Sequence, residues 1–85
     1  MVEVIVVTST ACHLCVDALE GLAELSADFP LSIREVDILS PEGIGLVERH
    51  RPAMPPAVVI DGELFSSGRL PRKKLRRSLE PARVA

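Results

Sequence analysis

Residues 2–15 read Val2-Glu-Val-Ile-Val-Val-Thr-Ser-Thr-Ala-Cys-His-Leu-Cys15, and this stretch decides the fold. The β-branched run that ends at Thr8 predicts a buried strand. The apolar spacing that follows predicts a helix from about Cys12 to Asp28, with a cap within residues 8–11. Cys12 and Cys15, the two cysteines of this 85-residue chain, therefore lie at a strand-to-helix turn. Free N–H groups at a helix N-terminus stabilise a thiolate, which favours Cys12 as the reactive thiol.

The rest of the chain alternates strand and helix signals. Ser40-Pro41-Glu42 is typical of a helix start, although Gly43 and Gly45 weaken that helix. Asp61-Gly62 indicates a hairpin turn. We expect strands at 31–38, 57–60 and 63–66, and helices at 40–51 and from Pro71 onward. The order β-α-β-α-β-β-α predicts one α/β domain over residues 1–80, with a tail at 81–85.

Composition and charge narrow the class of protein. No apolar run is long enough to span a membrane, and residues 1–8 resemble a strand more than a signal peptide. We therefore expect a cytoplasmic protein with no membrane partner, and we expect it to be a monomer.

Acidic side chains dominate residues 1–48 and basic ones dominate residues 49–85. The basic run 69–77 could contact phosphates. The chain has no Trp or Tyr to stack on bases, so we expect no nucleic-acid partner and favour pairing with the acidic first helix.

The Cys12-His-Leu-Cys15 motif allows three interpretations. Two thiols at this spacing can exchange with a disulfide, one attacking and the other releasing the adduct. They can also ligate a metal, but they supply only half of a tetrahedral zinc site. The third interpretation is a pair of small buried hydrophobes. His13 within the motif can supply positive charge near the thiolate.

A second segment, Pro56-Ala-Val-Val-Ile-Asp-Gly62, narrows these interpretations. Together with the motif at 12–15 and the element order, it resembles the thioredoxin superfamily, and small glutaredoxin-like members above all. The resemblance implies a thioredoxin-like fold with a four-stranded mixed sheet and helices on both faces. It implies that Cys12 is the nucleophile, Cys15 the resolving thiol and Pro56 the cis-proline, with Pro55 the alternative. It also implies that the protein needs no cofactor and no metal.

The resemblance also suggests where a substrate binds. Side chains beside the motif and around the cis-proline would modulate the thiols or contact the substrate: Thr10, Ala11, His13, Leu14, Met54, Pro55, Ser67 and Gly68. Pro55 has no N–H to donate to a substrate backbone. Arg69 stands where glutaredoxins carry a glutathione-binding acid. Val4–Val7 lacks the aspartate of thioredoxins, so the sequence shows no proton acceptor for Cys15.

These features predict a thiol–disulfide oxidoreductase. Its partners would be a protein or small molecule that contains a disulfide, and a reductase system. Two alternatives are a metal or iron–sulfur carrier and a non-catalytic binding module on the same scaffold.

Overall fold

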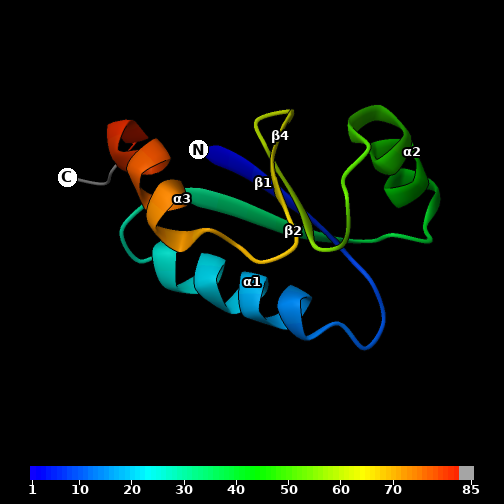
Figure 1. Cartoon of the computed structure of the whole chain (residues 1–85). Helices are drawn as coiled ribbons and strands as arrows, with labels where there is room; N and C mark the ends of the chain where they lie inside the picture. Colours follow the sequence, from blue (N-terminus) through cyan, green and yellow to red (C-terminus); the bar gives the residue numbers. More distant parts are fainter. Residues whose placement is uncertain (83–85) are drawn as a thin grey trace.

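The computed structural model describes residues 1–82, and its elements follow the predicted order (Figure 1). They are β1 (Val2–Thr8), α1 (His13–Leu25), β2 (Leu31–Asp37), α2 (Pro41–His50), β3 (Ala57–Ile60), β4 (Glu63–Ser67), α3 (Arg72–Leu79) and a short 3-10 helix, η1 (Glu80–Ala82). Within residues 1–82, no helix combines the length and apolar character needed to cross a bilayer.

The four strands form one mixed sheet in the order β2-β1-β3-β4. β1 pairs in parallel with β2, whereas β3 pairs antiparallel with both β1 and β4. The register places Val7 of β1 opposite Ala57 of β3. The end of β1 and the start of β3 therefore lie at the same end of the sheet, which brings the cysteine motif and Pro56 to one region.

Helices cover both faces of this sheet, as the resemblance implies. Side chains of a strand alternate between its faces, so β1 contributes to two cores. Val4 and Val6 pack with buried residues of α1 and α3, whereas Ile5 and Val7 pack with the face that α2 covers through Leu46. Apart from Cys15, the buried hydrophobic residues of the described chain are aliphatic except for Phe29, which is fully buried. The predicted fold class is confirmed.

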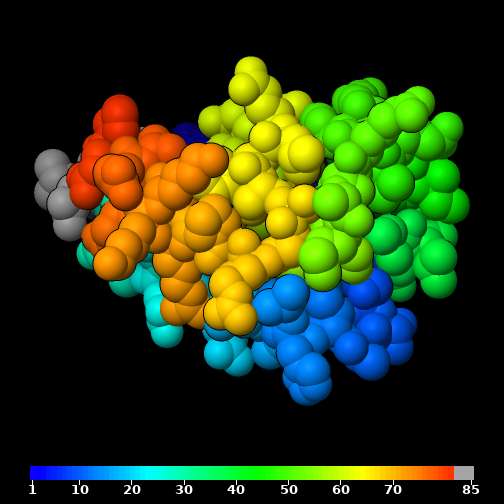
Figure 2. Space-filling model, viewed as in Figure 1, coloured from blue at the N-terminus to red at the C-terminus, as the bar shows by residue number. Residues whose placement is uncertain are grey.

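The predicted contact between the first and last helices is also confirmed. Arg72 of α3 pairs with Asp17 at 2.9 Å and with Glu24 at 3.1 Å, and Arg76 pairs with Asp28 at 2.9 Å. Figure 2 shows α3 in orange directly against α1 in cyan. Because these side chains are largely exposed, each pair contributes about 1 kcal/mol or less. The charge asymmetry of the sequence thus reflects, in part, two helices that neutralise each other.

Several predicted boundaries were wrong by a few residues. α1 begins at His13 because Cys12 is its N-cap. It ends at Leu25 because the N–H groups of Ala27 and Asp28 donate to carbonyl oxygens three residues earlier, and no longer to those four residues earlier as in an α-helix. β2 ends at Asp37 and β4 extends to Ser67. Residues 80–82 form a 3-10 turn where a tail was expected from residue 81, and residues 83–85 lie outside the described part of the chain.

Candidate redox site

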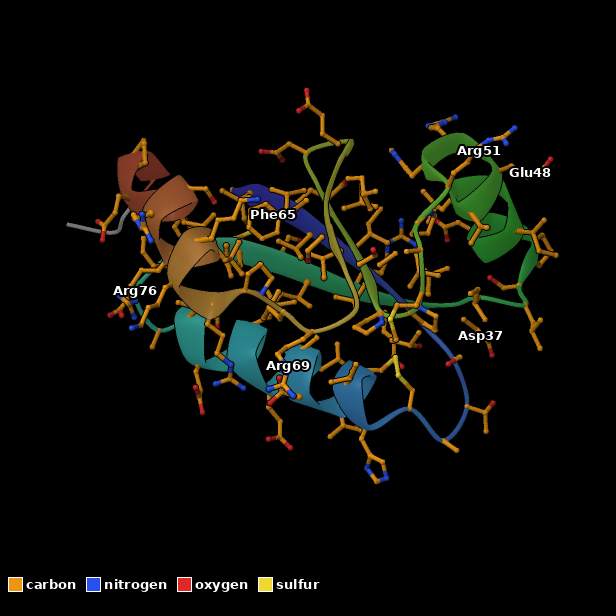
Figure 3. All side chains as sticks on the ribbon, viewed as in Figure 1. Asp37, Glu48, Arg51, Phe65, Arg69 and Arg76 are labelled. Carbon is orange, nitrogen blue, oxygen red and sulfur yellow. A yellow bond between two sulfur atoms is a disulfide. The ribbon has the colours of Figure 1, made fainter. Side chains whose placement is uncertain are left out.

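Cys12 and Cys15 form a disulfide at the N-terminus of α1, with their Cα atoms 5.2 Å apart. Figure 3 shows the yellow sulfur–sulfur bond beside the first turn of that helix. Cys12 has extended backbone angles and caps the helix, because its Sγ accepts the N–H of Cys15 at 3.0 Å. Cys12 is half-buried, whereas Cys15 is only 3% exposed. The helix cap is thus Cys12 of the disulfide itself, and not one of residues 8–11 as the sequence predicted.

Ala11 gives the chain the turn that places Cys12 at the cap. Its φ of 53° lies in the left-handed region, which non-glycine residues adopt only at a cost of about 1 kcal/mol or more. Strained backbone of this kind often occurs at functional sites. No residue preference in the sequence indicates it, since Gly or Asn is the usual residue in this conformation.

The predicted cis peptide bond is present between Pro55 and Pro56. Pro56 is fully buried, and its carbonyl accepts the N–H of Gly68 at 2.9 Å. A Cβ added to Gly68 would lie 3.3 Å from the Met54 Sδ. The segment before β3 and the segment after β4 are thus held together, and four of the residues predicted to contact a substrate share this region, namely Met54, Pro55, Ser67 and Gly68.

The other predicted site residues lie around the cysteines. Thr10, Ala11 and His13 are exposed, and Leu14 is half-buried. Ala11 and His13 line a hollow of about 320 Å³ together with both cysteines. Arg69 is exposed and projects over α1 in the view of Figure 3. The structure therefore places both groups of predicted residues at the end of the sheet where β1 ends and β3 begins.

Glu35 of β2 also lines this hollow, and the sequence interpretation did not include it. Its Oε2 accepts the hydroxyl of Thr8 at 2.9 Å. The alternation in the sequence places Leu31, Ile33 and Glu35 on one face of β2, but it does not show that Glu35 lies beside the cysteines.

Two pKa shifts occur away from the cysteines, in an exposed pair that joins β2 to α2. The Arg34 guanidinium donates two hydrogen bonds to Glu42, at 2.6 and 2.7 Å. These bonds lower the pKa of the Glu42 carboxyl below its ordinary value of 4.5 and raise the pKa of Arg34. Among residues 1–82, no group of three or more His, Cys, Asp and Glu side chains could hold a metal ion.

Comparison with solved structures places this geometry among thioredoxin folds. An uncharacterised thioredoxin-like protein from Clostridium perfringens superposes with a TM-score of 0.76 at 15% identity, over 96% of this chain and 71% of that one. A mutant thioredoxin from Halobacterium salinarum gives 0.70 at 17% identity, over 99% and 76%. Thioredoxin O2 from Arabidopsis thaliana, in its oxidised state, gives 0.70 at 18% identity, over 95% and 74%. A search of curated proteins gave no match.

Fold and site together define a thioredoxin-fold protein with a cysteine pair suited to a redox-type role. The model of the glutaredoxin-like domain matches residues 3–80. The chain belongs to this glutaredoxin-like family.

Proposed function

We propose that this protein is a thiol–disulfide oxidoreductase that exchanges electrons with protein or small-molecule disulfides. The observation that carries the proposal is the unequal placement of the two sulfurs. Cys12 is the half-exposed cap of α1 and accepts an N–H, whereas Cys15 is buried behind it. A sulfur that can meet a substrate while backbone dipoles stabilise its thiolate is suited to attack.

The exchange requires both cysteines, which act one after the other. The Cys12 thiolate attacks one sulfur of a substrate disulfide, a mixed disulfide forms, and the other substrate sulfur leaves as a thiol. The Cys15 thiolate then attacks the Cys12 sulfur, which releases the second substrate thiol and leaves Cys12–Cys15 oxidised. The N–H of Cys15 contacts the Cys12 sulfur in the disulfide form, and the same N–H would stabilise the Cys12 thiolate once the pair is reduced. A reductase system or a small thiol must return two electrons to close the cycle.

The substrate would bind across the end of the sheet beside the disulfide. Met54 is 49% exposed next to the buried Pro56, and Gly68 lies against it. Pro55 offers a carbonyl but no N–H, so we expect weak capture of a substrate backbone at this position. Thr10 and Ala11 would form the opposite rim.

Matched serine variants test the two roles. With insulin as the disulfide substrate and dithiothreitol as the electron source, Cys12→Ser should abolish catalysed reduction. Reduced Cys15→Ser, freed of dithiothreitol before it is mixed with insulin, should accumulate a covalent mixed disulfide, detected by mass spectrometry under non-reducing conditions. The same variant can then capture natural partners for identification.

Two outcomes would contradict the proposal. If Cys12→Ser keeps the activity, Cys12 is not the nucleophile. If Cys12→Ser forms the stable adduct and Cys15→Ser does not, the two roles are reversed.

The visible spectrum and metal content of freshly purified protein test the alternative of a metal or iron–sulfur carrier directly, and a stoichiometric metal or cluster would favour it.

A further inference from the structure

The proposed exchange needs a proton acceptor for Cys15, because a thiol must lose its proton before it attacks the mixed disulfide. β1 carries no acid at its buried positions, where Val4, Ile5, Val6 and Val7 are all apolar. A carboxylate that accepts this proton would therefore have to come from another element. The hollow beside the cysteines contains one carboxylate, that of Glu35 on the neighbouring strand.

The carboxylate of Glu35 is held in place from the strand that leads to the cysteines. Thr8, the last residue of β1, is 6% exposed and donates its hydroxyl to Glu35 Oε2 at 2.9 Å. A buried hydroxyl with one rotatable bond holds its partner in a narrow range of positions. The parallel register of β1 and β2 places Glu35 opposite Val6, on the same sheet face as α1, and leaves the Glu35 side chain exposed. Glu35 on the sheet and Cys15 on the helix thus line the same hollow.

We propose that Glu35 is the proton acceptor for Cys15 and that Thr8 is its positioning residue. This inference rests on the proposed function. A hollow of about 320 Å³ admits water, and the hydroxyl and carboxylate on its wall can hold a water molecule that relays the proton. The other walls include Val16 and Leu19, whose apolar surface limits competing polar contacts.

The step balances in atoms and electrons. The Cys15 thiol gives its proton to the Glu35 carboxylate through the water, and the thiolate attacks the Cys12 sulfur. The bond between Cys12 and the substrate sulfur breaks, and the Cys12–Cys15 bond forms. The departing substrate thiolate takes the proton back from Glu35, so the carboxylate is restored. The substrate disulfide gains two electrons over the whole exchange, and the cysteine pair loses them.

The acceleration that a proton acceptor can give to the attack by Cys15 has an upper limit. An unassisted cysteine thiol is a few per cent ionised near pH 7, so a base can increase the reactive fraction by about thirtyfold at most. We therefore expect Glu35→Gln to slow the attack by Cys15 about tenfold near neutral pH. Electrostatics alone predicts the opposite sign, because removal of a nearby negative charge favours a thiolate and would speed the attack.

Rapid mixing of the reduced protein with dithiobis(nitrobenzoate) separates the two attacks. Each attack releases one coloured thiolate, the first through Cys12 and the second through Cys15, and Cys15→Ser identifies the second phase by its absence. Glu35→Gln should slow the second phase about tenfold, change the first by less than twofold, and make the second rise more steeply with pH. Thr8→Val, which removes the hydroxyl with little change of shape, should slow the second phase about threefold and provides the test if the Gln variant fails to fold.

Asp37→Asn is the matched control. Asp37 lies two residues further along the same face of β2, borders a neighbouring hollow with Glu35, and does not line the one that contains the cysteines. Its loss of charge should leave the second phase within twofold. Among the described residues, His13 is the remaining titratable side chain on the cysteine hollow besides Glu35 and the cysteines.

Three results would overturn the proposal: a second phase unchanged or faster in Glu35→Gln, equal slowing in Asp37→Asn, or slowing in His13→Gln in place of Glu35→Gln. Each can occur while the insulin assay still shows a working Cys12–Cys15 pair. Failure of the insulin assay with the wild-type protein would instead reject the proposed function.

Discussion

Gly43 and Gly45 occupy the same helix, α2, but their surroundings predict opposite effects of an added methyl group. A Cβ at Gly45 would meet no atom within 4 Å. A Cβ at Gly43 would overlap the carbonyl oxygen of Asp37 and lie 2.9 Å from both the Asp37 carbonyl carbon and the Ile38 Cα. These are backbone atoms at the end of β2, and they cannot rotate away. The glycine that weakens the helix in isolation is therefore required where α2 meets the sheet.

The magnitudes follow from these contacts. Replacing a helical glycine by alanine stabilises a protein by about 0.5–1 kcal/mol where there is room, so Gly45→Ala should raise the free energy of unfolding by that amount. At Gly43 the same gain is opposed by overpacking, which destabilises by about 1–3 kcal/mol and by more against rigid backbone. We expect Gly43→Ala to lower the free energy of unfolding by about 1–3 kcal/mol. For a domain of this size, about 1 kcal/mol shifts the Tm by about 4–8 °C.

Urea unfolding followed by far-UV circular dichroism measures both variants, since the chain has no Trp or Tyr for fluorescence. All samples should be held in the same cysteine oxidation state, so that the disulfide contributes equally. Equal stabilisation by Gly43→Ala and Gly45→Ala would refute the close approach of α2 to the end of β2. It would also remove the physical reason for a glycine at residue 43.

Two further predictions concern the core and the exposed ion pair. Leu22 is fully buried between α1 and the sheet, so Leu22→Ala should lower the free energy of unfolding by about 2–5 kcal/mol in the same urea assay, and a loss below about 1 kcal/mol would contradict its packing. The pKa of Glu42 is lowered in the folded state by the hydrogen bonds from Arg34, so the pair stabilises the fold above the ordinary value of 4.5, and that contribution is lost as pH falls through the folded pKa. The wild-type protein should therefore have a higher free energy of unfolding than Arg34→Gln near neutral pH, and urea titrations should show this difference shrinking below about pH 4.5. A difference in the free energy of unfolding that does not change with pH would exclude the ion pair as its source.

Much of the site could be predicted because its signals are local. A β-branched run, a turn, two cysteines at helical spacing and a downstream Pro56 segment each depend on neighbouring residues. The cysteine positions relative to α1 match what these signals predicted, and the cis bond at Pro56 matches what the resemblance to glutaredoxin-like proteins implied. The helix cap was assigned to the wrong residues, since cysteine is an unusual N-cap and Ser and Thr are the common ones.

The part that could not be predicted depends on how distant segments align. Glu35 reaches the hollow because β1 and β2 pair in one particular register, and a shift of one residue would turn its side chain to the opposite face. The requirement for Gly43 arises in the same way, from the distance between α2 and the end of β2.

The order of the elements, the position of Cys12 and Cys15 at a strand-to-helix turn, and the class of chemistry that such a pair supports all follow from the sequence. The tertiary structure was needed to show that Cys12 itself caps α1 and that residue 43 must be a glycine. It was also needed to show that Glu35 lines the hollow beside the cysteines, where it accepts the hydroxyl of Thr8. The physical reason is that backbone preferences act over a few neighbouring residues, whereas burial and side-chain contact depend on the register of strands far apart in the chain.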